Sequence, residues 1–127
     1  SLAKRSVVPM NRADVYDAKL DPAQGSEQAG TRPVIIVSRD AINDASPVVL
    51  VVPCIKYRGQ LLYLSHVLVP APEGGLDVDS VAMAELLRPL AKARLGQYRG
   101  AISESVLMKL NDALFVALGL PAQLSAS

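Results

Sequence analysis

Apolar and polar positions alternate along much of the chain, a pattern typical of β-strands that bury one face. Over residues 12–20, Tyr16, Ala18 and Leu20 fall on one parity, and the other parity is mostly polar, so this segment is predicted as the first strand. Residues 33–38 form the next predicted strand. The unbroken, β-branched run 48–52 suits a strand buried on both faces at the centre of the core.

Three further strands are predicted at residues 61–69, 79–84 and 98–102. Pro53 is expected to stop ladder pairing after the central strand, so that residues 54–58 leave the sheet. The connections are predicted as a short helical turn or loop over residues 39–46 closed by Pro47, a plain surface loop over 70–75, and a short helix or turn over 88–94.

The last apolar stretch changes to helical spacing and predicts one C-terminal helix. Ser103 is its expected N-cap, and Gly119 with Pro121 ends it. The apolar stripe that would pack on the sheet consists of Val106, Leu107, Leu110, Leu114, Ala117 and Leu118. Several short strands followed by a terminal helix fit a small, partly open barrel.

Length and composition are those of one domain with a real core, since half of the 127 residues are hydrophobic. We expect residues 1–11 to be a flexible basic lead, 12–120 the domain, and 121–127 a tail. The single cysteine, Cys54, excludes an internal disulfide and lies beside the buried run 48–52, which favours a packed thiol over a nucleophile. No apolar run approaches the roughly 20 residues that span a bilayer, and a reducing cytoplasm is the expected location.

Charge and aromatic content limit the kind of nucleic-acid contact that the chain can make. The net charge is only +1, so any RNA contact must be local. Four Tyr, one Phe and no Trp give little support to a base-stacking platform. The one histidine, His66, lies in a predicted strand without a nearby cluster of His, Cys or carboxylates, which favours a packed or hydrogen-bonded ring over a metal ligand, and no cofactor is expected.

The stretch richest in candidate chemistry is the polar hinge over residues 25–33, which leads directly into the apolar run 34–37. Arg32 is the only cation in the hinge, and a guanidinium grips phosphate bidentately and stabilises charge that develops on it. An ordinary hairpin loop whose arginine points into water is the alternative interpretation.

The order of short motifs resembles the MazF/PemK toxins over residues 12–120. The matching pieces are Asp14-Val15-Tyr16, Leu20-Asp21-Pro22, Gly25-Ser26-Glu27-Gln28 with Gly30, Thr31-Arg32-Pro33-Val34, Val52-Pro53-Cys54, Ser65-His66-Val67, Asp79-Ser80-Val81, Glu85 with Arg88, and Ala113-Leu114 to Leu118-Gly119-Leu120. The resemblance implies a mainly β fold with α, an SH3-like (PemK/CcdB-type) barrel of about five to six antiparallel strands with a C-terminal helix. It also implies a sequence-specific ribonuclease of a toxin–antitoxin system.

The resemblance further implies a metal-independent cleavage of single-stranded RNA that leaves a cyclic phosphate and a 5′-hydroxyl. Arg32 would be the catalytic residue. The implied substrate-binding residues are Ser26, Glu27, Gln28, Thr31, Lys56, Glu85 and Arg88. Glu27 and Glu85 are also possible bases. Where the family pattern has a threonine after the third strand, this chain has Ile55, which lacks a hydroxyl; Lys56 could supply charge from the next position, although an extended backbone would point it elsewhere.

Two classes of function therefore stay open. One is an endoribonuclease toxin held by an antitoxin whose acidic, extended C-terminal tail enters the groove around Arg32; such a toxin would be a homodimer, and its complex with antitoxin would bind DNA. The other, favoured by Ile55, is a catalytically weak or inactive binding module that sequesters antitoxin, or a gyrase-directed poison like CcdB.

Overall fold

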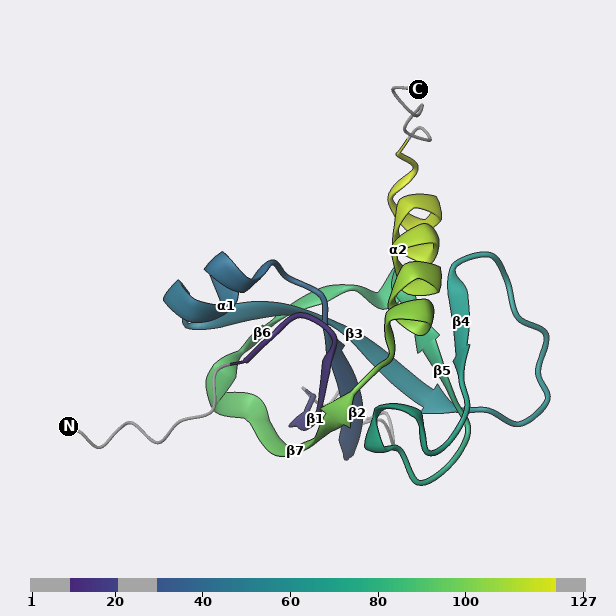
Figure 1. Ribbon diagram of the computed structural model, residues 1–127, viewed down its shortest axis with the longest axis horizontal. Coiled ribbons are helices and arrows are strands. Elements are labelled where there is room, and N and C mark those ends of the chain that lie inside the picture. Colours follow the sequence, from purple (N-terminus) through teal and green to yellow (C-terminus); the bar gives the residue numbers. More distant parts are fainter. Residues whose placement is uncertain (1–9, 21–29, 121–127) are drawn as a thin grey trace.

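The computed structural model describes residues 10–20 and 30–120, which form one curved antiparallel sheet with a long helix at one end (Figure 1). The strands are β1 Asp14–Lys19, β2 Thr31–Ile36, β3 Val48–Lys56, β4 His66–Val69, β5 Ser80–Met83, β6 Arg88–Ala91 and β7 Leu95–Ala101. The helices are α1 Asp40–Ala45 and α2 Glu104–Leu118, and the 3₁₀ turns are η3 Glu73–Gly75, η4 Ala84–Leu86 and η5 Lys92–Arg94. No helix in this part of the chain is both long and apolar enough to cross a membrane.

The sheet is ordered β4-β5-β3-β2-β1-β7, with β6 paired beside the first half of β3. The mainly β fold with a C-terminal helix is thus confirmed. The sheet has seven strands and is not closed into a barrel, because β4 and β7, at the two ends of this path, do not pair with each other in the described residues.

The central strand is longer than predicted. β3 continues through Pro53 to Lys56, so the prediction that residues 54–58 leave the sheet is wrong for 54–56. Pro53 pairs with Val34 of β2, while on the other edge of β3 β6 pairs only up to Val51 and β5 only from Cys54. A residue without an N–H therefore lies at the gap between two partner strands, where no ladder bond is lost on that edge.

Two apolar clusters lie on opposite sides of the sheet and explain why the run 34–37 is continuously apolar. Ile35 and Val37 belong to the cluster that includes Leu110 of α2, whereas Val34 and Ile36 belong to the second cluster, with Val49. Cys54 is a fully buried member of the first cluster, in agreement with a packed thiol, and burial raises its pKa to about 12.

Several predicted boundaries were wrong because strand pairing is decided by distant segments. Only residues 66–69 of the predicted strand 61–69 are a strand, since β5 has four residues and pairs all of them with β4. The predicted helix or turn 88–94 is the strand β6 followed by η5, because Leu90 is buried in the second cluster. β7 begins at Leu95, earlier than predicted.

The helical predictions are confirmed apart from one residue of the predicted stripe, since Leu118 is 56% exposed and does not pack on the sheet. α1 lies within the predicted turn 39–46. In α2 the Ser103 hydroxyl accepts a hydrogen bond from the Val106 N–H, and Gly119 ends the helix with φ 68°.

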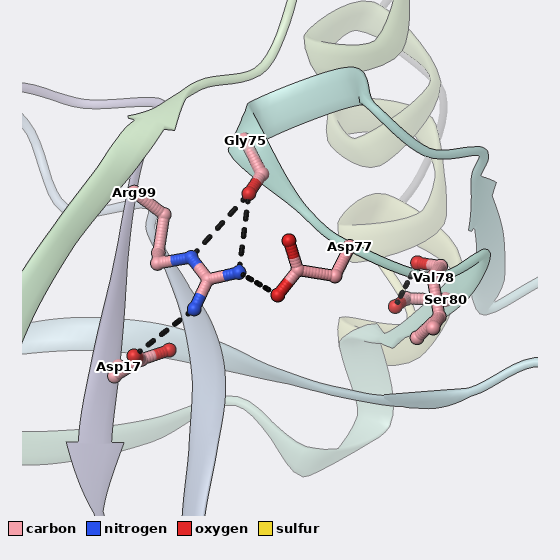
Figure 2. A network of polar contacts seen from close by, with 6 residues as sticks. All are labelled: Asp17, Gly75, Asp77, Val78, Ser80 and Arg99. Atoms are coloured by element: carbon pink, nitrogen blue, oxygen red, sulfur yellow. Dashed lines mark hydrogen bonds and ion pairs between the residues drawn. The ribbon is translucent and has the colours of Figure 1, made fainter.

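The segment 70–75 is more than a plain surface loop, because an arginine of β7 and close backbone packing fix it. Arg99 donates to the Gly75 carbonyl, to Asp77 at 2.7 Å and to Asp17 of β1 at 3.2 Å (Figure 2). Gly74 is buried, and a Cβ there would lie 2.9 Å from Val15. These contacts tie η3 to the edge formed by β1 and β7.

Candidate active site

Arg32 and the end of β3 meet in one cleft. Val34 pairs with Pro53, and carrying this antiparallel register two residues further brings Ile55 opposite Arg32. The cleft has a volume of about 230 Å³ and is lined by Arg32, Ile55, Lys56, Arg58 and Gln60. The geometry therefore joins a residue from the second strand with residues from the third strand and from the loop that follows it.

The cleft concentrates positive charge in a chain that is nearly neutral overall. Arg32, Lys56 and Arg58 are the charged residues among its described lining, and none of the described lining residues is a carboxylate. No ion pair joins any of the three to an acidic side chain within residues 10–20 and 30–120. Arg32 is half-buried, whereas Lys56 and Arg58 are exposed. Three cations without an ion pair to a described acidic side chain, placed around one small concavity, make a site for a phosphate or another anion.

A short turn after β3 holds the rim of the cleft. The Gln60 side chain accepts a hydrogen bond from the Arg58 N–H at 2.6 Å and donates to the Lys56 carbonyl at 3.4 Å. Gly59 has φ 83°, which favours glycine. The sequence interpretation missed Arg58 and Gln60, although Gly59, shortly before the predicted strand 61–69, is a signal for a turn that brings its neighbours back toward the end of β3.

Comparison with known proteins identifies the family. Residues 11–118 match the model of the PemK-like, MazF-like toxins of type II toxin–antitoxin systems. The chain belongs to this family. It is 40% identical over 111 residues to "Endoribonuclease MazF" of Staphylococcus epidermidis, an alignment that covers 87% of this chain and 92% of the relative.

Solved structures of MazF-like proteins share the fold. A mycobacterial endoribonuclease in complex with its cognate antitoxin has a TM-score of 0.76 and 28% identity, with 90% of this chain and 99% of that one covered. MazF from Deinococcus radiodurans has a TM-score of 0.73 at 23% identity, with 90% and 100% covered, and shows the likeness of fold alone. The resemblance to MazF/PemK toxins inferred from the motifs is confirmed.

Among the described residues that the MazF/PemK pattern suggested, Thr31, Glu85 and Arg88 do not line this cleft. Thr31 is exposed at the start of β2, pairs with Lys19, and lines a separate, open cavity of about 700 Å³ with residues of β1, η5 and β7. Ser26, Glu27 and Gln28 lie outside the described residues.

Arg88, the first residue of β6, lies beside the half of β3 that is further from the cleft. It pairs with Val51, four residues before Ile55, which corresponds to about 13 Å along an extended strand. Arg88 is half-buried and does not line the cleft with Arg32.

Glu85 is held by neighbours in the chain's own fold. Its carboxylate accepts hydrogen bonds from Ser65 Oγ at 2.9 Å and from His66 Nε2 at 2.8 Å. Desolvation raises the pKa of Glu85, but the hydrogen bonds, chiefly that from His66, outweigh it and leave the pKa lowered. A carboxylate with a lowered pKa is a poor proton acceptor near neutral pH, so the geometry favours a structural role for Glu85 over that of a base.

Near the cleft, the described residues include no cluster of metal-ligating side chains. Across the described segments, no group of three or more His, Cys, Asp or Glu residues is arranged to hold a metal ion. His66, the one histidine, is hydrogen-bonded and its side chain is 8% exposed, in agreement with a packed ring.

Proposed function

We propose that this MazF-like toxin is an endoribonuclease that binds a phosphodiester of single-stranded RNA in the cleft of Arg32, Lys56 and Arg58 and cleaves it without a metal ion. The observation that carries the proposal is the convergence of three cations, from two strands and a loop, on one cleft whose described lining residues include no carboxylate. Relatives at about 40% identity are named endoribonucleases, which supports the same class of activity here.

The proposed step is attack by the ribose 2′-oxygen on the adjacent phosphorus. The 2′-oxygen–phosphorus bond forms and the bond from phosphorus to the 5′-oxygen breaks, which leaves a cyclic phosphate and a 5′-hydroxyl. The proton of the 2′-hydroxyl passes to a base, and the departing 5′-oxygen receives a proton. Arg32 would hold two non-bridging oxygens and stabilise the charge of the pentavalent state.

The remaining candidates are given roles from the described lining of the cleft or from their sequence positions beside Arg32. Lys56 and Arg58 would bind the same or the neighbouring phosphate, because they line the cleft with Arg32. Ser26, Glu27 and Gln28, together with Thr31, are proposed as further substrate contacts on their sequence positions beside Arg32. Arg88 is proposed to contact RNA at a different nucleotide from the one bound in the cleft.

An antitoxin is the proposed protein partner, and a solved relative is described as an endoribonuclease in complex with its cognate antitoxin. We propose that the antitoxin places an acidic, extended C-terminal tail on the cations of the cleft, that it competes there with RNA, and that the complex of toxin and antitoxin binds DNA in the cytoplasm. Binding of such a tail should weaken as salt rises, because exposed Lys56 and Arg58 are screened.

A homodimer is proposed as the toxin's own assembly. The C-terminal half of α2 exposes Phe115 and Leu118, which line a groove of about 420 Å³. The groove is lined by Arg12, Asn111, Leu114, Phe115, Leu118 and Leu120. A second copy would cover this apolar surface.

A binding module with weak or no catalysis is the second candidate, and Ile55 favours it. Ile55 lines the cleft beside Arg32 and offers no hydroxyl to the phosphate. Changing Ile55 to Thr would restore a donor there. We expect cleavage by the Ile55→Thr variant to rise by about tenfold, the effect of one charge-assisted hydrogen bond, in a single-turnover assay. A folded variant that cleaves more slowly than the parent would show that the cleft does not use a donor at this position.

The proposed function is tested by incubating the protein with a mixed-sequence RNA in EDTA. We expect fragments whose 5′ ends map to a short motif and whose 3′ ends carry a cyclic phosphate, as mass spectrometry would show. Intact RNA at stoichiometric protein would overturn the catalytic proposal and leave the binding module, which a filter-binding measurement on the same RNA would then detect.

A further inference from the structure

The loop between β3 and β4, residues 57–65, carries Arg58 and Gln60 of the cleft, yet its tip is not held by burial. Leu61, Tyr63 and Leu64 are 74%, 64% and 80% exposed. A loop with so little buried apolar area must be fixed by polar contacts if Arg58 is to keep its position. The contacts at its two ends therefore decide how rigid the rim of the cleft is.

At the β4 end those contacts converge on His66. The Tyr63 N–H donates to His66 Nδ1 at 3.1 Å, and His66 Nε2 donates to Glu85 at 2.8 Å. This pattern assigns the proton of a neutral ring to Nε2, because Nδ1 acts as the acceptor. The Tyr63 and His66 rings also meet edge to face, with centroids 5.3 Å apart.

Glu85 anchors the ring to η4. Its second oxygen accepts from Ser65, and the Ala84 N–H donates to the Ser65 carbonyl at 2.9 Å. The far end of the loop is fixed separately, since the Tyr57 N–H donates to the Asp79 carbonyl at 2.9 Å. The imidazole thus links the Tyr63 N–H to Glu85. It acts beside the Ser65 hydroxyl, which also donates to Glu85, and beside the His66 N–H, which donates to the Tyr63 carbonyl at 2.9 Å.

We infer that His66 is a positioning residue, which clasps the loop 57–65 through the Tyr63 N–H and Glu85 and thereby holds Arg58 and Gln60 at the rim of the cleft. The inference rests on the proposed function of that cleft. It assigns to His66 and Glu85 an effect on RNA binding that is transmitted through the loop, without contact between either side chain and the reacting atoms.

Two substitutions of His66 separate the clasp from a general structural role. His66→Gln places an amide near the position of Nε2, which keeps a donor for Glu85 and removes the acceptor for Tyr63. His66→Asn places an oxygen near the position of Nδ1, which keeps the acceptor for Tyr63 and removes the donor for Glu85. A second matched pair leaves His66 intact: Tyr63→Pro and Tyr63→Ala both remove the exposed ring, but only proline removes the N–H.

The readouts are amide exchange of Tyr63 and the Kd for an uncleavable 2′-O-methyl RNA of mixed sequence at pH 8. We expect His66→Gln to speed exchange and to raise Kd about threefold to tenfold, the factor that corresponds to one net hydrogen bond, and His66→Asn to stay close to the parent. Tyr63→Pro should bind more weakly than Tyr63→Ala by the same factor, and kcat for cleavage should change by less than about twofold.

The outcomes distinguish this inference from the proposed function. A parent protein that does not bind the RNA at all overturns the function of the cleft and the inference with it. A parent that binds, with equal Kd in the two variants of each pair, overturns the clasp alone. Unchanged amide exchange of Tyr63 in folded His66→Gln overturns the clasp as well. If His66→Gln does not fold, the comparison of Tyr63→Pro with Tyr63→Ala decides.

Discussion

Arg32 differs from the other cations of the cleft in being part of a paired strand. It lies opposite Ala18 of β1, is half-buried, and precedes Pro33, whose ring fixes its own φ. Lys56 and Arg58 are exposed, and Arg58 stands on a loop. A half-buried arginine whose backbone is fixed in a paired strand has less freedom to lose when it binds a phosphate, which suits Arg32 to transition-state stabilisation.

Cys54 gives the fold a dependence on alkaline pH. Burial raises the pKa of its thiol from 9.0 to about 12, so the unfolded chain loses this proton at lower pH than the folded chain does. The folded state binds more protons than the unfolded state between pH 9 and 12. The contribution of the Cys54 thiol to the free energy of unfolding therefore falls as pH rises through that window. The slope is at most about 1.4 kcal/mol per pH unit.

Urea unfolding at pH 8 and pH 10.5 of the parent and of Cys54→Ala checks this. The parent should lose more stability than the variant between the two pH values, whatever the variant's stability at pH 8. Parallel losses would show that the thiol does not couple to folding.

At the scale of elements, the 3₁₀ turn η3 is fixed against β7 by close backbone packing. Gly75 has φ 73°, and a Cβ there would lie 1.9 Å from the Arg99 carbonyl oxygen. Gly119 has a nearly equal φ of 68°, with nothing within 4 Å of such a Cβ. We expect Gly119→Ala to lower the free energy of unfolding by about 1 kcal/mol, and Gly75→Ala by about 3 kcal/mol or more.

The comparison of these two alanine variants isolates the steric clash, since both carry the same backbone strain. Denaturant unfolding at neutral pH measures each value. Equal losses of unfolding free energy in both variants would mean that η3 can move away from β7 without a loss of stability.

The elements that could be predicted from the sequence are those whose signal is local. The helical stripe, Ser103 and Gly119 set the bounds of α2, and alternation located β1. The continuation of β3 through Pro53 could not be predicted, because it depends on where β6 stops and β5 starts on the same edge. The strand expected over 61–65 failed for a related reason, since nothing in those residues reveals that no partner strand is available.

The candidate site shows the same division. Arg32 could be identified because it directly precedes the predicted strand 33–38, and Lys56 because it follows Ile55, where the family pattern has a threonine. Arg58 and Gln60 were missed, since only the turn at Gly59 returns them to the cleft. Glu85 and Arg88 were grouped with Arg32 by their place in a motif, but the fold pairs one with His66 and the other with a distant part of β3.

At the scale of the whole molecule, the exposed apolar face of α2 predicts a homodimer. Leu118 is 56% exposed and lines the groove beside that face, so Leu118→Glu should keep the fold and shift the protein toward monomer. Lys109→Glu is the control, because nine residues of helix place it on the opposite side of α2.

Sedimentation measures the outcome. The parent and Lys109→Glu should sediment as dimers at protein concentrations of tens of micromolar, roughly the highest dissociation constant expected for a specific dimer interface. A parent that is monomeric at this concentration would contradict the proposed assembly, and a dimeric Leu118→Glu would place the interface elsewhere.

RNA cleavage in the cleft of Arg32, Lys56 and Arg58 is proposed to depend on Arg32, and the cleavage rate of Arg32→Lys without a metal ion tests this dependence. Lysine keeps the charge but loses the planar fork, so the single-turnover rate in EDTA should fall by roughly a hundredfold or more, the size expected when one preorganised transition-state donor is removed. Arg39→Lys, the same change at an exposed position before α1, should cleave like the parent. A folded Arg32→Lys protein that cleaves at the parent's rate would show that cleavage does not depend on Arg32 and would place the active site outside this cleft.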